Sequence, residues 1–204
     1  MNKEIATERI EDFWEWFYKM EGKYKQFFTE NAVVDRDQLV EAMNNRVLDF
    51  GMFSWEIGPT DPPGYYLTIS PGGNKELLSI SKSIMQAAPA LRDWVFYPAK
   101  PAKPTDLAFN LYDSFMIERR IDAADWYFAL KDGPDFSKDI MLEAHSIKTL
   151  DEETQKTAGD LVVIRMIGEE RKIKQVNKVL VFDKLPERYR ATKQPIFQLS
   201  KIWK

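Results

Sequence analysis

The spacing of apolar residues changes near residue 51, and this change constrains the fold more than any other feature of the sequence. Before it, large apolar residues recur at helical steps, which predicts one helix over about residues 4 to 28 and another that begins at Asp35. After it, residues 53–57 alternate apolar with polar or small side chains, as in a strand with one buried face. Two helices are therefore expected before the first strand.

A β-β-α-β order follows the two predicted helices. Residues 65–69 alternate like the strand before them, so the two strands are expected to form an antiparallel hairpin. Asn74 stands where the alternation stops and is expected to cap a helix. Residues 94–97 then predict a third strand.

A proline-rich segment separates this order from the rest of the chain. Proline occupies every third position from Pro98 to Pro104, which predicts a stiff, extended connector. The expected organisation is one compact unit over residues 1–204, with a helical segment at 1–50, a first half at 51–97, the connector at 98–105 and a second half at 106–204.

The second half repeats a similar order of predicted elements. Mostly apolar runs predict a meander of strands at residues 107–112, 115–121, 126–130 and 140–147. Thr149 and Glu152 match a capping box for a helix that ends near Gly168. The charged residues 169–174 predict a solvated turn, and residues 179–182 a further strand.

The fold expected from these elements is α+β, with two N-terminal helices packed on a largely antiparallel sheet built from two β-β-α-β-like halves. The matching order around Trp55 and Trp126 raises the hypothesis of an internal repeat whose functional surface lies where the halves meet. Ordinary sheet topology is the alternative explanation.

Composition excludes several classes of function. The chain has no cysteine, which rules out disulfides, a thiolate zinc site and a cysteine nucleophile. Its net charge of −3 gives no basic footprint, so no nucleic-acid partner is expected. The sequence has no apolar run long enough to cross a bilayer and no signal-peptide pattern, so we expect a cytoplasmic protein without a membrane partner.

His145, the single histidine, is one candidate for chemistry. It is expected on the same strand face as Glu143, whose carboxylate could orient the imidazole as a general base. No Gly-x-Ser-x-Gly motif accompanies it, and a half-exposed strand histidine is the simpler interpretation.

Two groups of carboxylates have spacings that could surround a hard cation if their loops curled. They are Asp132, Asp135 and Asp139, and Glu118, Asp122 and Asp125. Neither run matches an EF-hand, so solvated loops are the preferred interpretation, and no metal or other cofactor is expected.

The loop from Ser70 to Asn74 lies between a predicted strand and a helix N-terminus, where backbone N–H groups favour an anion. It lacks the Gly-Lys-Ser/Thr ending of a P-loop, so a simple turn and cap explain it as well. The candidate ligand-binding residues near such a cleft are Gly72, Gly73, Asn74, Glu56, Glu143 and His145.

Three stretches, Leu67–Asn74, Ala87–Leu91 and Trp94–Pro101, together resemble a pattern found in uncharacterised bacterial domains. Ile167–Glu169 is similar to the second recurring element of those domains. The resemblance implies a bacterial origin, and it implies no activity and no catalytic residue.

Two functions remain open from the sequence. The first is a non-enzymatic binding or interaction module of regulatory or immunity type, which the lack of a catalytic motif favours. The alternative is a small-molecule-binding domain or enzyme whose cleft lies near the Ser70–Asn74 loop. The partner is accordingly a protein or a small molecule, and the oligomeric state is left open.

Overall fold

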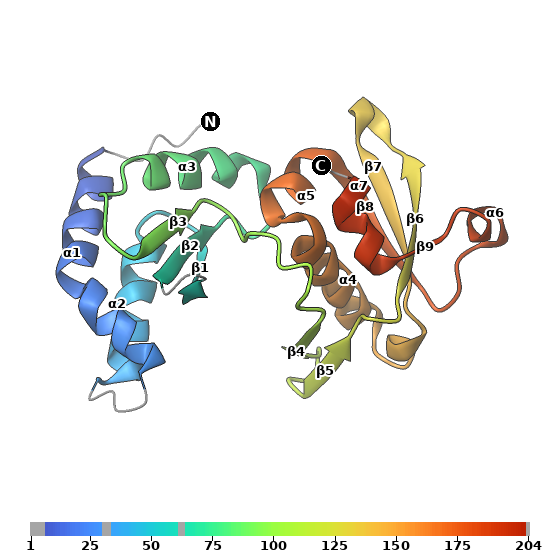
Figure 1. Cartoon of the computed structure of the whole chain (residues 1–204), viewed down its shortest axis with the longest axis horizontal. Helices are drawn as coiled ribbons and strands as arrows, with labels where there is room; N and C mark the ends of the chain where they lie inside the picture. Colours follow the sequence, from blue (N-terminus) through green and yellow to red (C-terminus); the bar gives the residue numbers. More distant parts are fainter. Residues whose placement is uncertain (1–6, 30–33, 61–63, 203–204) are drawn as a thin grey trace. The chain divides into compact units, whose positions relative to one another are not determined.

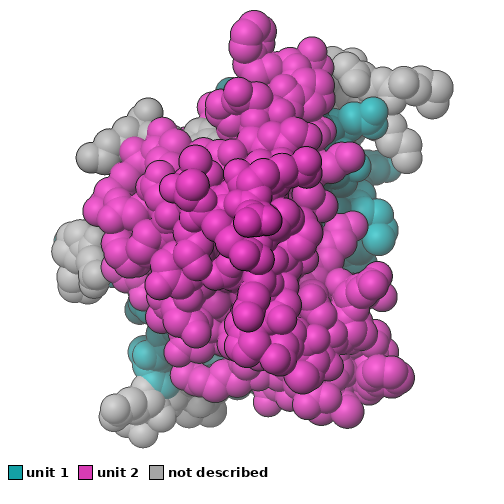
Figure 2. Space-filling view, turned by 90° about the vertical axis from the view of Figure 1, so that its right-hand side faces the viewer, with its two compact units in different colours: residues 1–100 teal, residues 101–204 magenta. Residues whose placement is uncertain are grey.

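A computed structural model describes residues 7–29, 34–60 and 64–202. The chain divides into two compact units, residues 1–100 and 101–204, which Figure 2 distinguishes by colour. The division falls inside the proline-rich segment predicted to be a connector. That the chain behaves as one folding unit stays a prediction. Within the described ranges, every helix is too short or too polar to cross a membrane.

Unit 1 has the predicted order of two helices followed by β-β-α-β (Figure 1). Its elements are α1 (Thr7–Lys25), α2 (Arg36–Leu48), β1 (Ser54–Thr60), β2 (Gly64–Ser70), α3 (Lys75–Gln86) and β3 (Trp94–Tyr97). Strand β2 pairs antiparallel with β1 and parallel with β3. Residues 4–6 of the first predicted helix and residues 61–63 of the hairpin loop lie outside the described residues.

The core of unit 1 combines apolar side chains of α1 and α2 with those of the sheet and Ile84 of α3, and α1 contributes several aromatic rings to it. Phe17 is fully buried, and Trp14 meets Phe96 of β3 edge to face with 4.7 Å between ring centroids. The polar atoms of these rings are satisfied, since Trp14 Nε1 donates to the Ile84 carbonyl at 2.8 Å and Tyr24 Oη to the Leu39 carbonyl at 2.8 Å. Core filling therefore explains these aromatic residues.

Unit 2 contains more strands, arranged in two sheets. Its elements are β4 (Ala108–Tyr112), β5 (Glu118–Asp122), β6 (Tyr127–Asp132), β7 (Lys138–Glu143), α4 (Glu152–Ile167), α5 (Glu169–Gln175), β8 (Val176–Phe182), α6 (Glu187–Arg190), β9 (Gln194–Pro195) and α7 (Leu199–Ile202). Strands β4 and β5 form a separate hairpin, and the larger sheet has the order β8-β7-β6-β9. Helices α4 and α7 lie on one side of this sheet and α6 lies on the other (Figure 1).

The two β-β-α-β halves have the same strand order and the same strand directions. In unit 2, β6 pairs antiparallel with β7, and β7 pairs parallel with β8 after the chain passes through α4 and α5. Unit 1 follows the same scheme with β1, β2, α3 and β3. The α+β class and its two similar halves are therefore confirmed, although the described strands form three sheets instead of one.

The predicted meander is wrong at the junction between β5 and β6. After β5 the chain turns, with the Ala123 N–H bonded to the Leu107 carbonyl and the Trp126 N–H to the Ala123 carbonyl, both at 3.1 Å. The turn leads into β6 without pairing it to β5, so β4 and β5 pair only with each other. Residues 115–117, predicted as strand, form the hairpin turn.

The charged residues 169–174 are also not the solvated turn predicted from their charge, because they belong to α5. Gly168 has φ of 82°, a conformation that favours glycine, and it ends α4 and starts α5. Glu169, the first residue of α5, is buried.

The helix caps are confirmed at Asn74 and corrected at Thr149. The Asn74 side chain accepts hydrogen bonds from the N–H groups of Glu76 and Leu77. At the start of α4 the cap is Asp151, whose carboxylate accepts from the N–H of Thr154 at 3.0 Å. Thr149 lies in the preceding turn and is exposed. The predicted start of the helix was two residues too early, because Asp151, a second residue of a type that caps helices, follows Thr149 two positions later.

Substitution of the caps tests these assignments. Asn74→Ala should lower the free energy of unfolding by about 1 kcal/mol, because two backbone N–H groups lose their acceptor. Asp151→Ala should also lower the urea midpoint, whereas Thr149→Ala should leave it unchanged. An equal loss for Thr149→Ala and Asp151→Ala in urea melts would contradict the observed start of α4.

Candidate functional site

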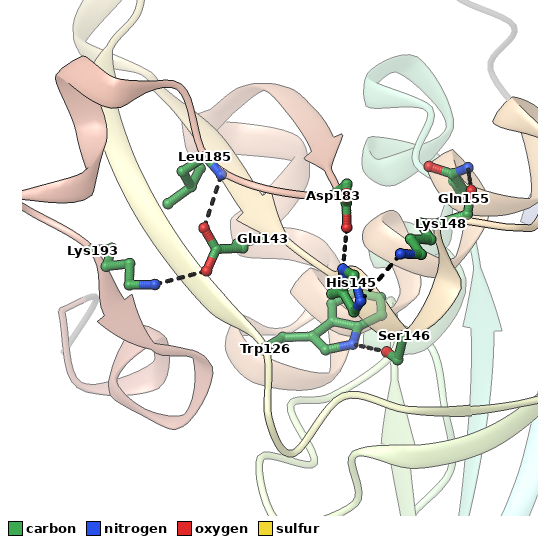
Figure 3. Close-up of polar contacts among 9 residues, drawn as sticks. All are labelled: Trp126, Glu143, His145, Ser146, Lys148, Gln155, Asp183, Leu185 and Lys193. Atoms are coloured by element: carbon green, nitrogen blue, oxygen red, sulfur yellow. Dashed lines mark hydrogen bonds and ion pairs between the residues drawn. The ribbon is translucent and has the colours of Figure 1, made fainter.

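Glu143, the last residue of β7, is hydrogen-bonded to the segment that follows β8 in the chain (Figure 3). One carboxylate oxygen accepts the Leu185 N–H at 2.8 Å, and the other accepts Lys193 Nζ at 2.7 Å. Burial raises the pKa of this carboxyl, but these hydrogen bonds, with the charges of Lys193 and Arg190, outweigh burial and hold the pKa below its ordinary value. Both oxygens of Glu143 are thus used structurally.

His145 is not on the strand, which corrects the expectation that it shares a face with Glu143. Strand β7 ends at Glu143, and His145 begins a 3-10 turn that the Ile147 N–H closes on the Ala144 carbonyl. Its Nδ1 is hydrogen-bonded to Asp183 instead of Glu143, and Lys148 Nζ lies 3.3 Å from its Nε2 (Figure 3).

This histidine has the Asp–His pairing of a general base but not the open nitrogen that a base needs. With Asp183 on one ring nitrogen and Lys148 on the other, both are engaged. Ser146 Oγ accepts from Trp126 Nε1 at 3.0 Å, and the described residues include no hydrogen bond between Ser146 and His145. The arrangement gives no activated nucleophile.

The other candidate residues belong to unit 1. Glu56 accepts a hydrogen bond from the Tyr66 hydroxyl across the β1–β2 pair. In the loop before α3, Gly72 and Gly73 have φ of 61° and 80°, which explains glycine at both positions. Ser70 Oγ accepts the Gly72 N–H at 3.2 Å. These contacts and the cap at Asn74 explain the residues of this loop by its role as a turn that leads into α3.

Two pockets are described in unit 1, and neither is lined by a predicted site residue. One, of about 370 Å³, is lined by Asn44, Val47, Leu48, Phe53, Ser54 and Trp55. The other, of about 270 Å³, is lined by Arg9, Asp12, Phe13, Arg46, Asp49 and Phe50. Neither includes a residue of the Ser70–Asn74 loop, where a cleft was expected.

The acidic loops do not gather around a common point. Over residues 7–29, 34–60 and 64–202, no three His, Asp or Glu side chains form a group that could hold a metal ion. Asp132 is paired with Lys138, and Asp139 accepts from Asn177 Nδ2 at 2.7 Å.

The turn between β4 and β5, residues 113–117, is a feature that sequence reasoning missed. We call these five residues the hairpin tip. Phe115 and Met116 are 77% and 76% exposed, and Ile117 is 49% exposed. Three consecutive apolar side chains therefore face solvent at a turn, where glycine, asparagine or serine is usual.

Asp113 holds the hairpin tip from inside. Its buried carboxylate accepts the N–H groups of Phe115 and Ile117, each at 2.9 Å, and Arg119 Nε at 2.8 Å. Main-chain bonds at 2.9 Å join the Asp113 N–H to the Ile117 carbonyl and the Met116 N–H to the Asp113 carbonyl. The tip is therefore an ordered turn, and Met116 is held at φ of 61°.

The carboxyl of Asp113 is also electrostatically perturbed. The Ile117 N–H above all holds its pKa below the ordinary value, and Arg119 and the Phe115 N–H act in the same direction against burial. The sequence signal was the pair Asp113-Ser114, a common turn start, but the apolar residues after it favoured a strand.

No family model matches this chain, and no curated protein or solved structure matches it either. The comparisons supply no activity, in agreement with the resemblance to uncharacterised bacterial domains, which implies none.

Asp113→Asn tests the electrostatic support of the tip. A carboxyl whose pKa is lowered on folding stabilises the fold above its unfolded pKa of about 3.9, and this stabilisation is lost as the pH falls through the folded pKa. The free energy of unfolding of the variant should therefore be lower than that of the natural protein at neutral pH. This difference in free energy should narrow below about pH 4. Urea melts at neutral and at acidic pH measure the difference.

Asp125→Asn is the matched control, since Asp125 is exposed and lies in the turn after β5. It should leave the free energy of unfolding at neutral pH close to that of the natural protein. If Asp113→Asn is less stable than the natural protein by the same free energy at every pH, the charge of Asp113 does not support the tip.

Proposed function

We propose that this chain is a non-catalytic interaction module of the bacterial cytoplasm, of regulatory or immunity type, and that it binds a protein partner through the hairpin tip. The observation that carries the proposal is the exposure of Phe115, Met116 and Ile117 on a turn that Asp113 holds in one conformation. The bacterial origin rests on the sequence resemblance, and the cytoplasmic location rests on the sequence composition.

An ordered apolar turn is well suited to binding. Large side chains that enter a partner's pocket supply most of the binding energy of many interfaces. A turn that is already ordered loses little conformational entropy on binding, so more of the energy of apolar burial appears as affinity. Tyr112, 64% exposed at the end of β4, adds an aromatic side chain beside the tip.

The contacts of the polar candidates favour binding over catalysis. Glu143 and His145 engage their polar atoms with neighbouring residues, and Asn74 caps α3. A small-molecule site near the Ser70–Asn74 loop gains no support from the two pockets described in unit 1.

The proposal is tested by affinity capture from an extract of the source cells, followed by calorimetry with the captured protein in purified form. Phe115→Ser should weaken binding at least about tenfold, because an interface anchor loses its aromatic ring. The melting temperature should be unchanged, since Phe115 makes its contacts through the main chain.

Phe136→Ser is the matched control. Phe136 is fully exposed, lies in the β6–β7 turn of the same unit and is a single apolar residue among polar ones. It should bind as the natural protein does. Equal binding by Phe115→Ser and the natural protein, or no captured protein at all, would contradict the proposal.

A further inference from the structure

We infer that the outer edge of β1 binds an extended peptide segment of another protein. The segment adds a strand to the sheet of unit 1 and places an apolar side chain in the pocket between α2 and β1. Strand β1 lies at one end of the order β1-β2-β3, so only one of its two sides is paired within the described part of the chain (Figure 1). This edge is separate from the hairpin tip and does not depend on the proposed function.

The pairing of β2 determines which main-chain groups of β1 point away from the sheet. The Tyr65 N–H donates to the carbonyl of Asp93, immediately before β3, at 2.7 Å. In a parallel pair the N–H and C=O of one residue point to the same neighbour, so Tyr65 directs both groups toward β3. Tyr66, the next residue, directs its groups toward β1, where its partner is Gly58. The residues of β1 that alternate with Gly58 therefore point their groups outward.

The residues that point outward are Trp55, Ile57 and Pro59. Proline is found in sheets where its missing N–H faces away from the neighbouring strand, so Pro59 agrees with this register. Over residues 7–29, 34–60 and 64–202, the outward N–H and C=O groups of Trp55 and Ile57 have no hydrogen-bond partner. Both residues are partly exposed. The edge therefore offers main-chain donors and acceptors at the spacing that an added strand requires.

The pocket of about 370 Å³ adjoins this edge at the start of β1. Its lining residues are Asn44, Val47 and Leu48 of α2 with Phe53, Ser54 and Trp55. Trp55 Nε1 donates to Asn44 Oδ1 at 2.7 Å, so the indole wall is already in position before a ligand binds. None of these lining side chains carries a charge, and a charged group buried among them would lose its hydration without gaining a partner. The matching side chain is therefore aliphatic or aromatic.

An extended peptide matches both the edge and the pocket. Its main chain can pair with Trp55 and Ile57, and its alternate side chains point to one face, so one of them lies beside Trp55 on the side of α2. A small apolar molecule would fill the pocket but leave the edge unpaired. A folded surface without a free strand would supply no main-chain groups to the edge.

The test selects random peptides, displayed on phage, against the full chain and measures the affinity of the selected peptides by fluorescence anisotropy. N-methylation of every second peptide amide should weaken binding at least about tenfold in one alternation, because hydrogen bonds to β1 are lost. Methylation in the other alternation should have little effect. Hydrogen exchange at the amides of Trp55 and Ile57 should slow when the peptide binds.

Leu48→Arg tests the pocket. Leu48 is 55% exposed and is the last residue of α2, where a basic side chain is favourable, so the melting temperature should be unchanged. Peptide binding should weaken at least about tenfold, because a charge enters an uncharged pocket. Val40→Arg is the matched control, since Val40 is 37% exposed on the same helix and lines neither described pocket. It should bind the peptides as the natural protein does.

Phe115→Ser should leave peptide binding unchanged, which separates the edge of β1 from the hairpin tip. If binding is lost in Phe115→Ser, the peptides occupy the tip and the inference is overturned. It is also overturned if no peptide binds, if both alternations of N-methylation act equally, or if Leu48→Arg binds as the natural protein does. Sedimentation equilibrium of the chain alone covers the other occupant, because a dimer that Leu48→Arg dissociates would assign the edge to a second copy of this chain.

Discussion

The parallel pairing of β2 with β3 and of β7 with β8 is the constraint on which the rest of each unit depends. Parallel neighbours cannot be joined by a tight turn, so the chain must leave the sheet, cross one face as a helix and return. Helix α3 makes this crossing in unit 1, and α4 with α5 makes it in unit 2. In unit 2 the buried face of α4 packs into the core of the unit. In unit 1 the crossing helix adds Ile84 to a core that α1 and α2 supply in larger part.

The β4–β5 hairpin of unit 2 is not part of the β-β-α-β order that the two units share. Its inward side chains, Phe109, Leu111 and Ile121, join the core of that unit, yet its strands pair only with each other. The hairpin lies below α4 in Figure 1, at the end of the unit opposite the β6–β7 turn. Since no neighbouring strand supports its turn, Asp113 supplies the order that a sheet would otherwise give.

Much of the fold could be predicted because its signals are local. The caps at Asp35 and Asn74 and the glycine stop at Gly168 each depend on residues within one turn of the chain. The errors depended on distant residues. That His145 pairs with Asp183, 38 residues away, follows from the parallel β7–β8 register, which no sequence period reports.

The hairpin tip could not be predicted for a related reason. Apolar side chains at Phe115 to Ile117 indicate burial by their chemistry, and only the buried carboxylate of Asp113 turns them outward. Composition shows how much apolar surface a chain has, but it does not show which part folding leaves exposed.

Hydrogen exchange at the amides of Phe115 and Ile117 tests most directly whether the tip is ordered before any partner binds. Both N–H groups donate to Asp113, so in the free natural protein they should exchange much more slowly than the neighbouring amide of Ser114, which is described without an acceptor. In Asp113→Asn the protection should fall while the amides of β7 stay protected. Exchange of Phe115 and Ile117 at the rate of an unstructured peptide in the natural protein would contradict the account.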